Sequence, residues 1–160
     1  MTLGPKVTAS RMVRDYVTEL YEPAAAASTR ANASGAAPAR ELAAWKETVR
    51  SAWPSVRIAS LDTDTRPGRA GEQRSVRAAV DLGGLAPADV RVEVLHGPID
   101  THGELLREPA RIELVHVVDG GWTGDYTVGR SGAYGLTARV LPLNPLLANN
   151  FEVGCIAWAE

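Results

Sequence analysis

The stretch SVRAAVDLGGLAPADVRVEVLH, residues 75–96, decides the fold that we expect for this chain. Its two halves, 75–82 and 90–96, alternate between apolar and other residues on either side of the Gly83-Gly84 pair. Alternation with period two places the apolar side chains on one face of a β-strand. An antiparallel sheet with one face toward water needs that arrangement. The stretch therefore predicts two strands of an antiparallel sheet.

The same period continues along the rest of the chain, with turn residues between short apolar runs. The strands that we expect lie at 56–61, 75–82, 90–96, 111–119, 122–128, 134–141 and 153–158. Asp119-Gly120-Gly121 is the strongest hairpin signal. Because a parallel sheet needs helices between its strands, the pattern favours an antiparallel immunoglobulin-like or fibronectin-like β-sandwich at 55–160.

Tyr134 follows Ser131-Gly132-Ala133 near the start of a late strand. In β-sandwiches a tyrosine at such a place forms a tyrosine corner, in which its hydroxyl bonds back to the main chain. Gly-x-Tyr also occurs often by chance. Both interpretations stay open at this point.

Helical spacing replaces alternation before the strands, so the fold class is α+β with N-terminal helices. Residues 39–54 predict a helix that ends at Pro54. Trp45 and Trp53 lie on its apolar face, where we interpret them as packing anchors; the alternative is a pair that stacks on sugar rings. Residues 24–38 are rich in alanine but have no shared period, and we interpret them as a linker.

The first 23 residues predict an amphipathic helix. Thr8 and Ser10 are candidate caps, and Pro23 ends the helix. Its apolar residues form a single stripe, which needs a partner. We therefore expect a docking face made of Met12, Val13, Tyr16, Val17 and Leu20.

Three segments carry a family resemblance. The run Ser10-Arg11-Met12-Val13-Arg14-Asp15-Tyr16 resembles the closing helix of the catalytic body in α-glucan (glycogen/maltodextrin) phosphorylases. ELAAWKETVRSAWPSVRI at 41–58 and GAYGLTARVLPLNPLLANNFEVGCIAW at 132–158 resemble the C-terminal extension of the large actinobacterial-type enzymes. The resemblance covers most of the chain except 24–38 and 62–74.

The resemblance implies a parent reaction, the reversible phosphorolysis of an α-1,4-glucan to glucose 1-phosphate with pyridoxal phosphate (PLP) as cofactor. In family members the PLP lysine, its phosphate contacts and the two nucleotide-binding-like domains lie upstream of this segment. We therefore expect an accessory, non-catalytic segment that holds no cofactor itself. Its expected partner is the phosphorylase catalytic domain, or a second copy through the first helix.

Two other functions stay open. In the first alternative, the chain is a stand-alone glucan-binding module with Trp122 and Tyr126 as the glucan contact. These residues are four apart, so they share one face of a strand. These two rings equally suit the core. In the other alternative, the chain is an interaction domain that docks its first helix into a groove of a partner.

Composition and spacing exclude several classes of function. The formal charge of −2, with both signs mixed along the chain, indicates neither nucleic acid nor an anionic membrane surface as a partner. The histidines His96, His102 and His116 fall in different segments, without the spacing of metal ligands. We expect no catalytic, cofactor or metal residues, a structural role for the single Cys155, and, without a signal peptide or transmembrane run, a cytoplasmic location.

Overall fold

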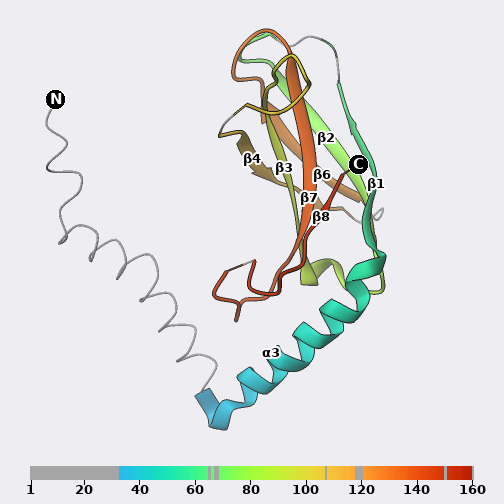
Figure 1. Cartoon of the computed structure of the whole chain (residues 1–160), viewed down its shortest axis with the longest axis vertical. Helices are drawn as coiled ribbons and strands as arrows, with labels where there is room; N and C mark the ends of the chain where they lie inside the picture. The colour runs from blue at the N-terminus through green and yellow to red at the C-terminus, as the bar shows by residue number, and fades with distance from the viewer. Residues whose placement is uncertain are drawn as a thin grey trace, which may run out of the picture.

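The computed structural model describes residues 33–64, 66, 69–106, 108–117, 121–149 and 151–159. The predicted helix at 1–23 lies outside these residues, and so does its docking face of Met12, Val13, Tyr16, Val17 and Leu20. That helix and its role stay predictions. In the described part, a helix leads at its C-terminal end into a body of β-strands, as Figure 1 shows.

In the described residues, eight strands form two four-stranded antiparallel sheets. The first sheet has the order β1 (Val56–Thr63), β2 (Gln73–Leu82), β6 (Gly121–Thr127), β5 (Val115–His116). The second has the order β4 (Ala110–Glu113), β3 (Val90–Pro98), β7 (Tyr134–Pro142), β8 (Ala157–Trp158). The predicted antiparallel architecture is confirmed.

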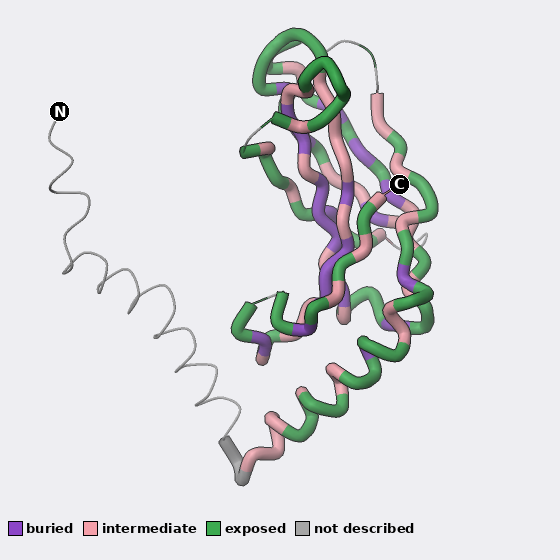
Figure 2. The backbone as a smooth tube through the Cα atoms, in the orientation of Figure 1, coloured by how far each residue is buried: buried purple, intermediate pink, exposed green. Residues whose placement is uncertain are grey.

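The hydrophobic core lies between the two sheets, and Figure 2 shows most of the buried residues along their strands. Along β2 buried and exposed residues alternate from Gln73 to Ala78, as the sequence predicts. Each fully buried aliphatic or aromatic side chain contributes about 1.5–3 kcal/mol. The inward-facing residues of both sheets join one cluster, which makes the domain a β-sandwich: Val76, Ala78, Trp122 and Tyr126 from the first sheet, and Val92, Val94, Ala138 and Val140 from the second.

The segment 111–119 differs from the prediction, because it forms two strands instead of one. β4 pairs with β3 in the second sheet, and β5 pairs with β6 in the first. The chain crosses between the sheets at Leu114, whose side chain is buried in the core. The period of two cannot reveal such a crossing, since a buried leucine fits either strand. β5 and β6 do pair antiparallel across the predicted hairpin.

The last predicted strand, 153–158, is reduced to β8. Gly154 has φ +75°, which is left-handed backbone that ends an extended run. Its N–H donates to the carbonyl of Phe151 at 3.0 Å, which closes a turn there. The residues before β8 therefore belong to a turn.

The helix α3 spans Ala33–Ala52 and is followed by the 3-10 turn η3 (Trp53–Ser55). It starts inside the segment predicted as a linker at 24–38 and before the predicted start at 39. Alanine-rich sequence favours helix even without an apolar stripe, which explains the difference. Ala36, however, has φ 62°, two residues before Pro38, so the first residues of α3 are not in regular helical geometry.

α3 is attached to the sandwich by one face. Val49 is fully buried in the core, and Trp45 and Trp53 pack partly buried against it. This agrees with the interpretation of the two tryptophans as packing anchors. Within the described ranges, no helix combines the length and the apolar character that crossing a membrane requires.

Candidate functional site

Trp122 and Tyr126, the predicted glucan contact, lie in the core. Each is only 3% exposed, and both point from β6 toward the second sheet. A ring buried to this degree has no face open to a sugar. The structure therefore corrects the expectation of an exposed pair and agrees with the alternative that these rings fill the core.

Tyr126 belongs instead to a polar cluster between the sheets. Its hydroxyl and that of Thr63 on β1 are 3.2 Å apart, and its ring lies 4.8 Å from the buried imidazole of His96 on β3. The Nδ1 of His96 forms a 2.9 Å hydrogen bond with the hydroxyl of Tyr134. Burial lowers the pKa of His96, so a neutral imidazole is favoured there.

Tyr134 also makes the backward contact expected of a tyrosine corner. The N–H of Gly129 donates to its hydroxyl at 3.4 Å, across the connection between β6 and β7. Tyr134 is the first residue of β7. This hydrogen bond agrees with the tyrosine-corner interpretation, and the cluster serves to hold the two sheets together.

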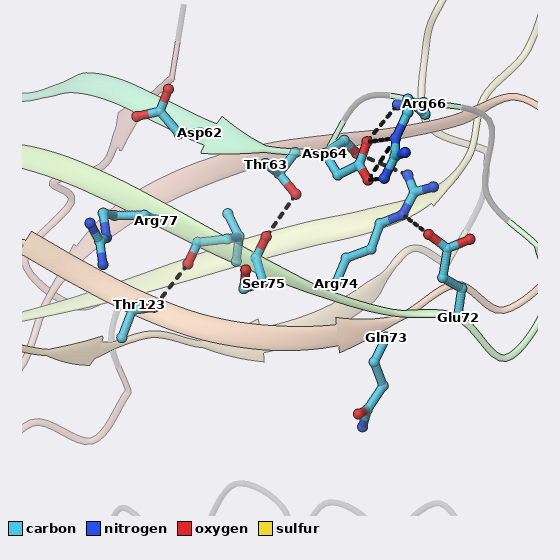
Figure 3. Close-up of a pocket in the computed structure, with 11 residues that line it drawn as sticks. Asp62, Thr63, Asp64, Arg66, Glu72, Gln73, Arg74, Ser75, Arg77 and Thr123 are labelled. Carbon is cyan, nitrogen blue, oxygen red and sulfur yellow. Dashed lines mark hydrogen bonds and ion pairs between the residues drawn. The ribbon is translucent and has the colours of Figure 1, made fainter.

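A cleft of about 810 Å³ lies at the ends of β1 and β2 and is lined mostly by charged and polar side chains (Figure 3). Arg74 is the most buried of these, with 4% of its side chain exposed. Its Nε donates to Glu72 at 3.0 Å, and its Nη1 donates to the carbonyl of Asp64 at 2.9 Å. Arg66 donates to the Asp64 carboxylate at 2.5 Å.

The charged and polar neighbours in this cleft lower the pKa of two of its carboxylates. The hydrogen bonds from Arg66 hold the pKa of Asp64 far below its ordinary range. The Arg69 N–H, and then the Arg74 guanidinium, lower the pKa of Glu72. Carboxylates held ionised are poor general acids, and the cleft holds a network of ion pairs at the ends of β1 and β2.

The described residues do not fit PLP. The cofactor needs a lysine amine free to react with it and donors that cradle its phosphate. Lys46 on α3 instead forms a 2.5 Å ion pair with Glu152, whose pKa it lowers. In the described part of the chain, moreover, histidine, cysteine and carboxylate side chains nowhere gather in threes that could hold a metal ion.

A second surface lies on the outer face of the second sheet. The guanidinium carbon of Arg139 on β7 is 5.6 Å from the ring centroid of Phe151 and 5.5 Å from that of Trp158. Both rings are exposed, Phe151 by 59% and Trp158 by 46%. We call these three residues the Arg139 platform. Phe151 and Trp158 are the exposed aromatic residues in the part of the chain that the structure describes.

Sequence reasoning did not single out the Arg139 platform. Phe151 follows an asparagine pair in a turn, and Trp158 ends the last alternating run, so neither stands in a recognisable row. The register that places Trp158 opposite Arg139 is a long-range pairing of β8 with β7.

Burial raises the pKa of the Cys155 thiol, which agrees with a structural role for this residue.

The comparisons with known proteins agree on one family. Residues 53–160 match the model of the glycogen phosphorylase C-terminal domain. Glycogen phosphorylase from Mycobacterium tuberculosis is 41% identical over 99% of this chain, and maltodextrin phosphorylase from Thermococcus litoralis is 29% identical over 98%. In both cases the chain spans only 19% of the relative's length.

One solved structure adds little. The conjugative transposon lipoprotein from Bacteroides eggerthii aligns with 65% of this chain and 92% of its own, at 12% identity. Its TM-score of 0.37 is too low to carry an argument. The family model and the two phosphorylases are the findings that decide: this chain belongs to the glycogen phosphorylase C-terminal domain family.

Proposed function

We propose that this chain acts as the C-terminal accessory segment of an α-glucan phosphorylase, whose reaction releases glucose 1-phosphate from an α-1,4-glucan. One observation carries the proposal. The chain matches the mycobacterial glycogen phosphorylase along 99% of its own length, but along only 19% of that enzyme. A segment of that size accompanies a catalytic body and does not replace it.

The role of the segment is accessory and not catalytic, and the cofactor belongs to the catalytic body. Two features of the described residues support this. The one described lysine is ion-paired with Glu152, and the charged cleft consists of side chains that neutralise one another. The parent enzyme works in the cytoplasm, in keeping with a single cysteine that has no partner for an internal disulfide.

The partner is the phosphorylase catalytic domain, which the first helix contacts. The stripe of Met12, Val13, Tyr16, Val17 and Leu20 provides the apolar face. When no catalytic domain is present, the same stripe promotes self-association, because an exposed apolar patch of this kind is rarely left uncovered.

A mixing experiment tests this partner. The M. tuberculosis enzyme, shortened by the stretch that matches this chain, is combined with the chain, and sedimentation velocity reports whether a complex forms. The wild-type chain should bind. The variant V13D/Y16D/L20D should not bind, whereas T18D, on the polar side of the predicted helix, should bind like the wild type. Binding by the triple variant, or by neither form, would refute docking through the stripe.

We also propose that the sandwich is immunoglobulin-like. If β1 to β8 are labelled A, B, C, C′, D, E, F and G, the two sheets read ABED and C′CFG. That is the sheet division of immunoglobulin-type domains. The Tyr134 hydroxyl, at the start of the strand labelled F, supports it through its bond from Gly129. An experimental structure with a different strand order in either sheet would refute this assignment.

A further inference from the structure

The Arg139 platform joins an ion pair within the second sheet to two exposed aromatic rings. Isolated exposed apolar residues are ordinary on a protein surface. Here two large rings that are seven residues apart in sequence both lie within cation–π distance of one guanidinium. Such an arrangement keeps two aromatic faces in a fixed relation while leaving about half of each residue in solvent.

The guanidinium is held in place from below. Arg139 Nε and Nη2 contact Glu93 Oε2 at 2.9 and 2.8 Å, and Glu93 is only 2% exposed. Glu93 faces Arg139 across the β3–β7 register, and Trp158 faces Arg139 from β8 on the other side. Arg139 is therefore fixed between a buried carboxylate and an exposed indole.

Phe151 is positioned by a pinned turn. Its N–H donates to Asn149 Oδ1 at 2.9 Å, and its carbonyl accepts from Gly154. The next residue, Glu152, accepts from the N–H of Ala148 at 2.8 Å and pairs with Lys46 on α3. The backbone of the turn is thus held by its own hydrogen bonds and by an ion pair from Glu152 to the helix.

The chemistry of this surface suits a neutral, hydroxyl-rich polymer. Glu93 forms its closest ion pair with Arg139 and also lies 3.7 Å from Arg111. Glu93 takes two of the five N–H donors that a guanidinium has, and the other donors suit hydroxyl oxygens. Aromatic faces pack on the C–H faces of sugar rings. Of the other exposed large apolar residues in the described part of the chain, Val115 lies on β5 of the opposite sheet, whereas Ile156 is two residues before Trp158.

We propose that the Arg139 platform binds α-1,4-glucan chains, with Phe151 and Trp158 stacking on sugar rings and Arg139 donating to hydroxyls between them. This inference rests on the proposed function, because the parent reaction acts on α-glucan. The platform lies on the surface and not in a cavity, so it holds a stretch of polymer near the enzyme instead of enclosing a single sugar.

Affinity electrophoresis in gels that contain glycogen, together with calorimetry using maltoheptaose, tests the proposal on the full 160-residue chain. The wild-type chain should be retarded by glycogen and should bind maltoheptaose, but not cellohexaose, whose β-1,4 linkages give a differently shaped chain. F151A/W158A should bind about tenfold more weakly or worse, since losing a central aromatic contact has effects of that size. V115A, which removes an exposed side chain from the other sheet, should bind like the wild type.

Trp158→Phe separates stacking from folding, because it keeps a ring in place and should retain most of the affinity. Matching thermal melts for all variants exclude misfolding as the reason for a loss. The proposal would be overturned if glycogen did not retard the wild-type chain, or if F151A/W158A bound as tightly as the wild type. If F151A/W158A kept its glucan binding but no longer associated with the shortened mycobacterial enzyme, the platform would be a protein contact. That result would also overturn the proposal. Failure of the first-helix docking test leaves the gel result unaffected, so the two proposals fail separately.

Discussion

The indole N–H of Trp45 on α3 donates a 2.7 Å hydrogen bond to Oδ1 of Asp89, 44 residues further along the chain. The second oxygen of the same carboxylate accepts from the N–H of Ala86 at 3.0 Å, within the 3-10 turn η4 (Pro87–Asp89) that leads into β3. One carboxylate therefore fixes the turn and holds the helix on the sandwich. This makes the C-terminal half of α3 part of the folded domain.

Trp45→Phe should lower the free energy of unfolding by about 1.5–3 kcal/mol, because a part-buried charged carboxylate loses its indole donor. Urea denaturation monitored by circular dichroism measures the change.

Trp53→Phe is the matched control. The Trp53 Nε1 is buried without a hydrogen-bond partner among the described residues. Replacing Trp53 breaks no hydrogen bond, so W53F should lower the free energy of unfolding by less than W45F does. Equal costs for the two variants would show that Trp45 contributes by packing alone.

Deleting residues 1–38 should leave a cooperative thermal transition at nearly the wild-type midpoint. In the described part of the chain, Leu42 is the first residue that packs against the core. Differential scanning calorimetry measures the transition. A broad, non-cooperative melt of the shortened chain would mean that the first helix belongs to the core of this domain.

Arg139→Ala should destabilise the domain by about 3–5 kcal/mol, since it leaves the buried Glu93 carboxylate without its closest cation. Arg57→Ala removes the exposed ion pair with Asp81 and should change stability by no more than about 1 kcal/mol. Chemical denaturation compares the two. If R139A is as mild as R57A, then Arg111, 3.7 Å from Glu93, is sufficient to neutralise it.

The buried imidazole of His96 should make stability depend on pH. Its pKa in the folded state is lowered from the ordinary 6.5, so below pH 6.5 the unfolded state takes up a proton that the folded state does not. Stability is therefore full above pH 6.5 and falls as pH drops through it, by up to about 1.4 kcal/mol per pH unit.

His96→Gln should remove this slope while leaving an amide that can bond to the Tyr134 hydroxyl. Melting temperatures between pH 8 and 5.5 measure it. In that window the carboxylates with lowered pKa, Asp64, Glu72 and Glu152, stay ionised, since their ordinary values are 3.8 for aspartate and 4.5 for glutamate. Identical pH profiles for wild type and variant would exclude His96 as the source.

Much of the sandwich could be predicted from sequence, because side-chain alternation is local. Val76 and Ala78 on β2, or Val92 and Val94 on β3, reveal their buried face through period two alone. The crossing at Leu114 could not be predicted, because it depends on which sheet each half of the segment joins. The start of α3 was also missed, since alanine-rich sequence lacks the stripe by which an attached helix is recognised.

The candidate site was harder to predict, because it depends on how distant parts of the chain pack together. Trp122 and Tyr126 share a face, as their spacing indicates, but spacing does not say whether that face is wet or buried. The Arg139 platform joins a turn, an interior strand and an edge strand, and only the register of β7 with β8 brings Trp158 to Arg139. Such a surface has no local signature.

The most direct test of the central claim, that this chain is an accessory segment without catalytic power of its own, is a phosphorolysis assay on the purified chain. The chain is supplied with PLP, glycogen and phosphate, and glucose 1-phosphate is measured beside the Lys6→Ala/Lys46→Ala variant, which lacks both of the chain's lysines. We expect no glucose 1-phosphate from either protein and no one-to-one binding of PLP. Glucose 1-phosphate released in proportion to the wild-type chain, with one PLP bound per chain and both signals lost in the double variant, would contradict it.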